Sequence, residues 1–149
     1  MAIQDIREAM VIRERNIFLL TDPSGQIPRG NPNGYGLYYA DTRYLSGYDL
    51  SLGGGRLMVL LATAELGYSS EHVMTNFRTT DRGNQQIPHG TIEVHRTRVL
   101  EDVLEETIKV TNYNGFEVEI DLSMRFSADF ADVFVVRGYE PENLGGLHA

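Results

Sequence analysis

Hydrophobic and polar residues alternate with a period of two over long stretches in the second half of the chain. Every second residue from 117 to 126 is apolar, and the residues between them are charged or polar. Residues 104–111 show a similar alternation. A period of two is typical of a half-buried β-strand, whose successive side chains point to opposite faces. Both segments are therefore predicted to be strands.

The link between these two strands, Tyr-Asn-Gly at 113–115, is a turn signal. A two-residue loop would set Val110 opposite Glu119, whereas a three-residue loop sets it opposite Val118. A one-residue slip moves every side chain to the other face, so the burial pattern selects the three-residue loop, with Gly115 in the left-handed conformation. The predicted core face carries Ile108, Val110, Val118, Ile120, Leu122 and Met124.

A second hairpin is predicted just before, with its turn at Glu101-Asp102. This turn sets Arg98 opposite Glu105 as an ion pair on the solvent face. Ile92 and Val94 share the arginine face, so this strand is expected to change its sheet partner along its length or to be covered there.

The rest of the chain reads as short strands between turn signals. Tyr48 to Leu52, the glycines at 53–55 and the apolar residues at 57–61 predict a third hairpin, and Ile17 to Leu20 predict a strand before a turn at 23–25. Residues 30–36 and 80–90 are predicted loops, and only 4–10 and 129–134 could be helical. The expected fold is mainly β: an antiparallel, supersandwich-like β-sandwich with at most one or two short helices.

Composition narrows the function classes. The 149 residues carry a net charge of −8 with scattered arginines, so a nucleic-acid partner is not expected. The chain has no cysteine, no signal-peptide pattern and no apolar run of about 20 residues, so we expect no membrane association and a cytoplasmic location.

Candidate chemistry is sparse. The histidines are far apart without metal-ligand spacing, and no glycine-rich loop is placed to hold phosphate, so neither a metal nor a cofactor is expected. Carboxylates are plentiful, but most are explained as the solvated faces of strands, and we assign no catalytic residue. These carboxylates are Glu101, Asp102, Glu105, Glu106, Glu117, Glu119 and Asp121.

Residues 35–48 are unusually rich in tyrosine and also carry Asp41 and Arg43. Aromatic faces stack on sugar rings, and charged side chains make directional hydrogen bonds to hydroxyl groups. The alternative, which we favour, is that the tyrosines fill the core while Asp41 and Arg43 hold a loop. The candidate residues for a substrate or interdomain contact are Tyr38, Tyr39, Asp41, Arg43 and Tyr44.

Two segments resemble a known family. Residues 36–46 (GLYYADTRYLS) and 125–138 (RFSADFADVFVVRG) are similar to the "GL…DTRyLS" and "adFadlFevRG" blocks of the N-terminal domain of glycogen debranching enzymes of the amylo-α-1,6-glucosidase type. Val135 departs from this pattern, because an acidic residue is expected there. The resemblance covers about residues 12–138, leaving 1–11 as a lead-in and 139–149 as a linker or truncated end.

The resemblance implies a noncatalytic domain. In that family it precedes a helical (α/α)₆ barrel, which carries the catalytic acid and base for α-1,6 branch linkages. The chain would pack on this barrel of the same polypeptide and could contribute a loop to the α-glucan cleft. An autonomous carbohydrate-binding module is the alternative, and a small stand-alone enzyme is the least favoured.

The second block is the predicted docking and exit segment. Its candidate residues are Asp129, Phe130, Asp132, Phe134 and Arg137. Either aspartate could pair with Arg137, and a helical turn would place the two phenylalanines on one face. Exposure of that face predicts that the isolated domain can self-associate.

Overall fold

Antiparallel strands make up nearly all of the regular structure, which confirms the predicted mainly β fold. The structure is a computed structural model that describes residues 9–29 and 34–136. Its elements are β1 (Met10–Glu14), β2 (Ile17–Thr21), β3 (Gly36–Tyr39), β4 (Thr42–Leu45), β5 (Gly47–Leu52), β6 (Leu57–Thr63), β7 (Ser69–Asn76), β8 (Thr79–Thr80), β9 (Gln86–Ile87), β10 (Ile92–Leu100), β11 (Leu104–Asn112), β12 (Leu122–Ser127), β13 (Ala131–Asp132) and α1 (Val133–Val136). None of the helical structure in this part of the chain has the length and apolar character needed to cross a membrane.

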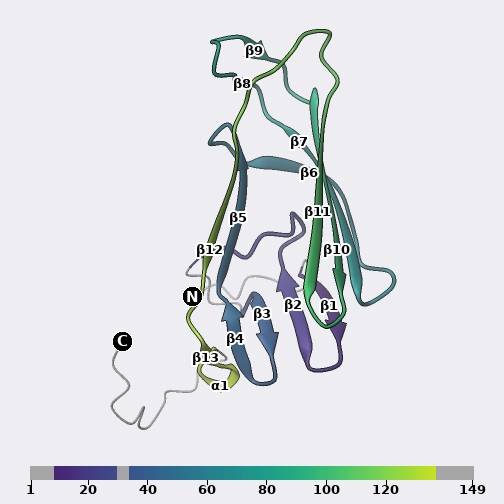
Figure 1. The fold of residues 1–149 in the computed structure, drawn as a ribbon, viewed down its shortest axis with the longest axis vertical. Helices are drawn as coiled ribbons and strands as arrows, with labels where there is room; N and C mark the ends of the chain where they lie inside the picture. Colours follow the sequence, from purple (N-terminus) through teal and green to yellow (C-terminus); the bar gives the residue numbers. More distant parts are fainter. Residues whose placement is uncertain (1–8, 30–33, 137–149) are drawn as a thin grey trace.

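The strands form two main sheets and two smaller ones. The five-stranded sheet has the order β1-β2-β3-β4-β13, and the four-stranded sheet has the order β11-β10-β7-β6. β12 pairs with β5, and β8 pairs with β9. In Figure 1 the β5–β12 pair stands opposite β10 and β11, and the five-stranded sheet lies at their lower end. This layout is a sandwich of antiparallel layers.

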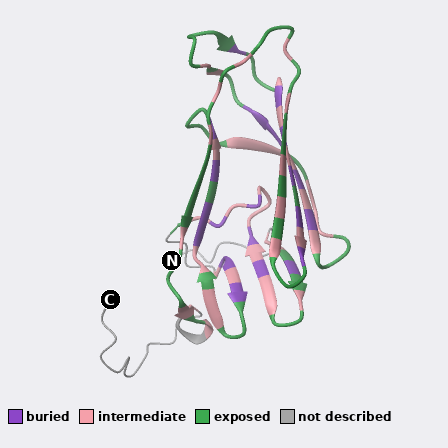
Figure 2. Cartoon of the chain, in the orientation of Figure 1, coloured by how far each residue is buried: buried purple, intermediate pink, exposed green. Residues whose placement is uncertain are grey.

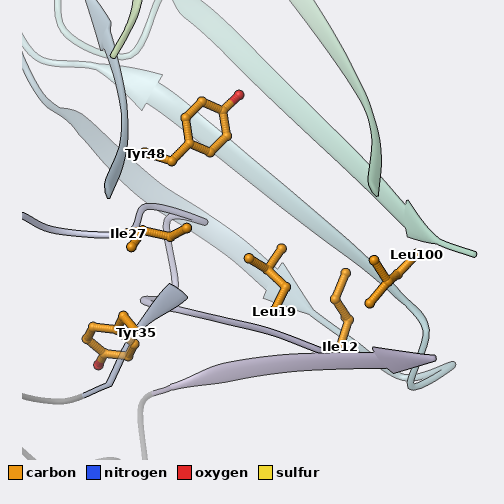
Figure 3. Close-up of a cluster of buried hydrophobic side chains, with 6 residues drawn as sticks. All are labelled: Ile12, Leu19, Ile27, Tyr35, Tyr48 and Leu100. Carbon is orange, nitrogen blue, oxygen red and sulfur yellow. The ribbon is translucent and has the colours of Figure 1, made fainter. Parts of the chain in front are cut away.

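Two apolar clusters fill the space between the layers. One consists of Ile12, Leu19, Ile27, Tyr35, Tyr48 and Leu100, which converge from several strands at the lower end (Figure 3). The other consists of Leu50, Leu52, Met74, Ile87, Ile92 and Val94. Buried positions alternate with less buried ones along β5 and β10, as the period of two requires (Figure 2). Full burial of one such aliphatic side chain contributes about 1.5–3 kcal/mol.

The predicted hairpin between 104–111 and 117–126 is wrong. Among the strands of the described residues, β11 pairs with β10 alone, and β12 pairs with β5 in a register that sets Met124 opposite Leu50. Residues 113–121 form an irregular connection, and Gly115 does not have a positive φ. β12 pairs elsewhere because its apolar alternation also matches the buried face of β5. Of the predicted core face, Val110 and Met124 are exposed and the other four residues are half-buried.

The predicted hairpin at Glu101-Asp102 exists, but its register differs by one residue. Leu100 lies opposite Leu104, and Arg98 lies opposite Glu106 rather than Glu105. The face shared by Ile92, Val94 and the arginines is therefore the buried face of β10, not the solvent face. The predicted exposed ion pair of Arg98 with Glu105 is wrong.

Other sequence expectations have mixed outcomes. The strand from Ile17 and the turn at 23–25 are confirmed, with Gly25 at a φ of 80°. The chain turns after Leu52, but β6 then pairs with β7, so no β5–β6 hairpin forms. The helix expected at 129–134 begins only at Val133. The possible helix at 4–10 lies mostly outside the described residues, as do Arg137 and the segment 139–149.

Candidate functional site

The two sequence blocks that carry the family resemblance lie side by side. The short strand β13 pairs antiparallel with β4, which sets Ala131 opposite Arg43 and Asp132 opposite Thr42. The backbone N–H of Val133 donates a hydrogen bond to the carbonyl oxygen of Asp41 at 2.7 Å. Figure 1 shows this junction beside α1, at the end of the described chain. The pairing joins the fourth strand of the chain to residues close to the end of its described part.

An ion pair holds the same junction. Arg43 Nε donates to Asp129 Oδ1 at 3.1 Å, and Arg43 Nη2 donates to Asp129 Oδ2, so the contact is bidentate. Arg43 Nη1 also donates to the carbonyl oxygen of Tyr35 at 3.3 Å. Partial burial would raise the pKa of the Asp129 carboxyl, but the hydrogen bonds from Arg43 and from the backbone N–H of Ala131 lower it below its usual value. Arg137, with which either Asp129 or Asp132 is predicted to pair, lies outside the described residues, and the partner of Asp129 in the structure is Arg43.

Three exposed aromatic rings lie on the segments that form this junction. Tyr39, Tyr44 and Phe130 are 52%, 44% and 64% exposed. The Tyr44 ring meets Phe130 edge-on, with centroids 5.7 Å apart, and lies 6.2 Å from Tyr39 in a tilted arrangement. Phe130 has a φ of 51°, a left-handed conformation that is rare for an aromatic residue. We call Tyr39, Tyr44 and Phe130, with the Arg43–Asp129 pair, the exit patch.

The other candidate residues are placed as follows. Tyr38 lies in the interior, 2% exposed, where its ring stacks on Phe18 and its hydroxyl donates to the carbonyl oxygen of Gly34 at 2.7 Å. Asp41 and Asp132 are exposed at the β4 and β13 ends of the junction. Phe134 lies within α1. The exit patch therefore unites four of the named contact and docking residues with Arg43.

The core also contains a cluster of buried polar side chains, which the sequence analysis did not predict. The side chains of Arg96 and Arg98 are fully buried, and both contact Glu106. Arg96 Nε donates to Glu106 Oε1 at 3.0 Å, Arg98 Nε donates to Glu106 Oε2 at 2.5 Å, and the Tyr48 hydroxyl donates to Glu106 Oε1 at 2.8 Å. The signal for it was the mixture of Ile92 and Val94 with arginines on one face. We call Tyr48, Arg96, Arg98 and Glu106 the buried clamp.

The clamp places two positive charges beside one carboxylate. Within the described residues, neither terminal nitrogen of Arg98 has a hydrogen-bond partner. The guanidinium carbons of Arg96 and Arg98 lie 4.8 and 5.3 Å from the centroid of the Tyr48 ring, so the aromatic face stabilises both cations. Burial would raise the pKa of Glu106, but the two arginines lower it below its usual value.

His72 lies close to the clamp and is kept neutral. Burial lowers its pKa to about 4. Its ring nitrogens lie 2.8 Å from the carbonyl oxygen of Pro23 and 3.1 Å from the hydroxyl of Ser70. A protonated His72 would add a third positive charge beside Arg96 and Arg98.

Tyr48 links the clamp to the two segments that lead to the exit patch. Tyr48 of the clamp follows Tyr44 by four residues, and its ring stacks on Phe126, with centroids 4.6 Å apart. Phe126 precedes Phe130 by four residues. The backbone N–H of Ser46 donates to the carbonyl oxygen of Ser127 at 2.8 Å between these points. Tyr48 therefore connects the clamp to β5 and β12, the strands next in sequence to the patch segments.

In residues 9–29 and 34–136, no group of three or more potential ligands is placed to hold a metal ion. A shallow pocket is lined by Glu14, Glu101 and Asp102, but all three carboxylates sit at or next to the turns of the β1–β2 and β10–β11 hairpins, and Arg15 lies between them. The clustered exposed rings of the exit patch are a candidate contact surface.

The described residues form an antiparallel β-sandwich with a cluster of exposed aromatic rings near the β4–β13 junction. The profile of the family described as the N-terminal domain of some glycogen debranching enzymes matches residues 12–149, and the chain belongs to this family. A search of curated proteins found no significant match.

Proposed function

We propose that this chain is a noncatalytic N-terminal domain of a glycogen debranching enzyme-like glycoside hydrolase. In this role it packs through the exit patch on a C-terminal (α/α)₆ barrel and brings the Asp41 loop to the glucan cleft. Family membership supports the general role. The single observation that carries the docking role is the exposure of three clustered rings at the point where the described chain ends.

Leaving these rings exposed to water is unfavourable, because apolar surface gains free energy when it is buried. Contiguous aromatic surface rimmed by polar groups is typical of an interaction site. Arg43 and Asp129 already satisfy one another, so a partner can cover them without leaving a bare charge. The β4–β13 pairing holds the patch rigidly, which lowers the entropy cost of docking.

The same rings are the reason to consider an autonomous carbohydrate-binding module as the second candidate. A sugar-binding platform presents a flat aromatic face to the sugar ring. Here Tyr44 and Phe130 meet at 90°, and Tyr39 and Tyr44 at 56°, so the rings form no common plane. Perpendicular rings fit an irregular protein surface better than an extended glucan.

Phe130→Ser in the full-length parent tests the docking role. This change should weaken interdomain contact and reduce debranching activity, because it removes the most exposed ring of the patch. Phe116→Ser is the matched control, since Phe116 is also an exposed phenylalanine but lies in the 113–121 connection. Equal activity of the two variants, together with unchanged hydrogen exchange at 39–44 and 129–133, would contradict the docking role.

The chain by itself should release no sugar from glycogen or pullulan. Turnover that disappears when one of its own carboxylates is substituted would contradict the noncatalytic role. Binding of the chain to glycogen in affinity electrophoresis, abolished by Tyr44→Ser, would favour the carbohydrate-binding alternative. Asp41→Ala in the parent should reduce activity more than it lowers this domain's melting temperature, because Asp41 is exposed.

A further inference from the structure

β11 presents a free edge on the opposite side of the four-stranded sheet from β6. In the part of the chain that the structure describes, only β10 pairs with it. An edge strand directs alternate backbone N–H and C=O groups away from its sheet, and these groups can pair with another strand. Val110, on the inner face of this edge, is 43% exposed. The edge therefore offers both hydrogen bonds and apolar surface.

The outer face of the same edge carries two opposite charges. Lys109 is the only lysine of the chain, and Glu105 precedes it by four residues on the same face. Both side chains are exposed, and neither has an ion-pair partner among the described residues. A lysine on an edge strand ordinarily discourages pairing unless a carboxylate meets it.

A second copy of β11 supplies that carboxylate. In an antiparallel pair with Thr107 opposite its own copy, Glu105 of each strand lies opposite Lys109 of the other. Opposite charges placed directly across a strand pair stabilise it. The same register sets Leu104 opposite Val110 on the inner face, so the apolar faces of both copies remain on one side.

The neighbouring registers do not pair Glu105 with Lys109 while also keeping the apolar faces together. Centring the pair on Glu106 would set the two Glu106 side chains against each other. Centring it on Ile108 would set Lys109 opposite Thr107 and leave both charges unpaired. A register centred between two residues would set the inner face of one copy against the outer face of the other. Only the Thr107 register satisfies both the charge pattern and the apolar pattern.

We propose that two copies of this chain pair antiparallel through β11, with Thr107 at the two-fold axis. The four-stranded sheets of the two copies then form one continuous sheet. This surface is separate from the exit patch, since β11 belongs to a different sheet from β4 and β13.

Zero-length carbodiimide crosslinking tests the register directly. Glu105 and Lys109 of one strand lie about 13 Å apart, too far for a direct amide bond. A Glu105–Lys109 crosslink can therefore form only between copies, and mixing ¹⁵N-labelled with unlabelled chain identifies it by mass. We expect this crosslinked peptide. Its absence from a crosslinked dimer would overturn the proposal.

Charge reversal provides the matched test in solution. Glu105→Lys sets two lysines opposite each other, and Lys109→Glu sets two glutamates opposite each other, so each variant should dimerise about tenfold more weakly in analytical ultracentrifugation. An equimolar mixture of the two should form a heterodimer, because every facing pair is then opposite in charge. Glu101→Lys, at the exposed turn, and Phe130→Ser, in the exit patch, should leave the dimer intact.

Several outcomes would overturn the proposal. These are a chain that stays monomeric at all concentrations, a dimer unaffected by either charge reversal, a mixture that forms no heterodimer, or a dimer lost in Phe130→Ser. Circular dichroism melting of each variant verifies that it is folded, so a loss of pairing is not confused with unfolding.

Discussion

Arg43 forms a bidentate ion pair with Asp129, which lies 86 residues further along the sequence. The Arg43 Nε donates a hydrogen bond to Asp129 Oδ1 at 3.1 Å, and Nη2 donates one to Oδ2. This bidentate contact joins the two sequence blocks that mark the family. It also fixes the residue before Phe130, so the exposed ring is held by a charged pair and not by packing alone. The patch is therefore ordered before any partner arrives.

The Arg43–Asp129 pair should contribute measurable coupling. In a double-mutant cycle of Arg43→Ala and Asp129→Ala, urea unfolding should give a coupling energy of about 1 kcal/mol, because the pair is bidentate but partly exposed. A cycle of Arg43→Ala with Asp102→Ala, at the exposed β10–β11 turn, is the control and should be close to additive. Additivity in both cycles would show that the pair does not hold the junction.

Glu106 should be among the most sensitive polar residues of the chain. Glu106→Gln leaves Arg96 and Arg98 buried without a countercharge, and we expect a loss of about 3–5 kcal/mol in the free energy of unfolding. Glu117→Gln, at an exposed position, should change it by less than about 0.5 kcal/mol. A similar loss of unfolding free energy in both variants would contradict the role of Glu106 as the countercharge of Arg96 and Arg98.

Stability should fall as the pH is lowered from 6.5 to 4. Unfolded His72 binds a proton below pH 6.5, but burial keeps the native residue neutral until about pH 4, so protons favour the unfolded chain across this window. The contribution of His72 is roughly 3 kcal/mol over the whole window. Urea unfolding at several pH values should give a flatter profile for His72→Gln. Parallel profiles for the two proteins would contradict this assignment.

Val94 and Val110 face each other across the β10–β11 pair but differ in burial. Val94 is fully buried, whereas Val110 is 43% exposed. Val94→Ala should cost about 2 kcal/mol, and Val110→Ala should cost less than about 1 kcal/mol. The measurement is urea unfolding at low protein concentration, where β11 pairing between copies is absent. Equal losses of unfolding free energy in the two variants would mean that Val110 is a core residue, as the sequence predicted.

Local sequence patterns predicted the strands at 17–20, 48–52, 57–61 and 104–111, but within the segment 117–126 only the part from Leu122 onward forms a strand. Alternation within 104–111 and the turn after Ile17–Leu20 depend on local side-chain period and local turn chemistry, so they can be read from one segment at a time. The blocks at 36–46 and 125–138 were likewise recognisable from their own residues. Each of these features depends only on residues that are close together in the sequence.

The tertiary structure decided which strands pair, in which register, and what is buried. β12 alternates well enough to pair with either β11 or β5, and the choice depends on which partner's inner face completes the core. A shift of one residue in the β10–β11 register makes Glu106, not Glu105, the partner of Arg98 and turns a predicted surface ion pair into a buried clamp. Arg43 meets Asp129 only because β13 returns to β4. Pairing energies depend on residues far apart in the chain, so no local pattern could specify them.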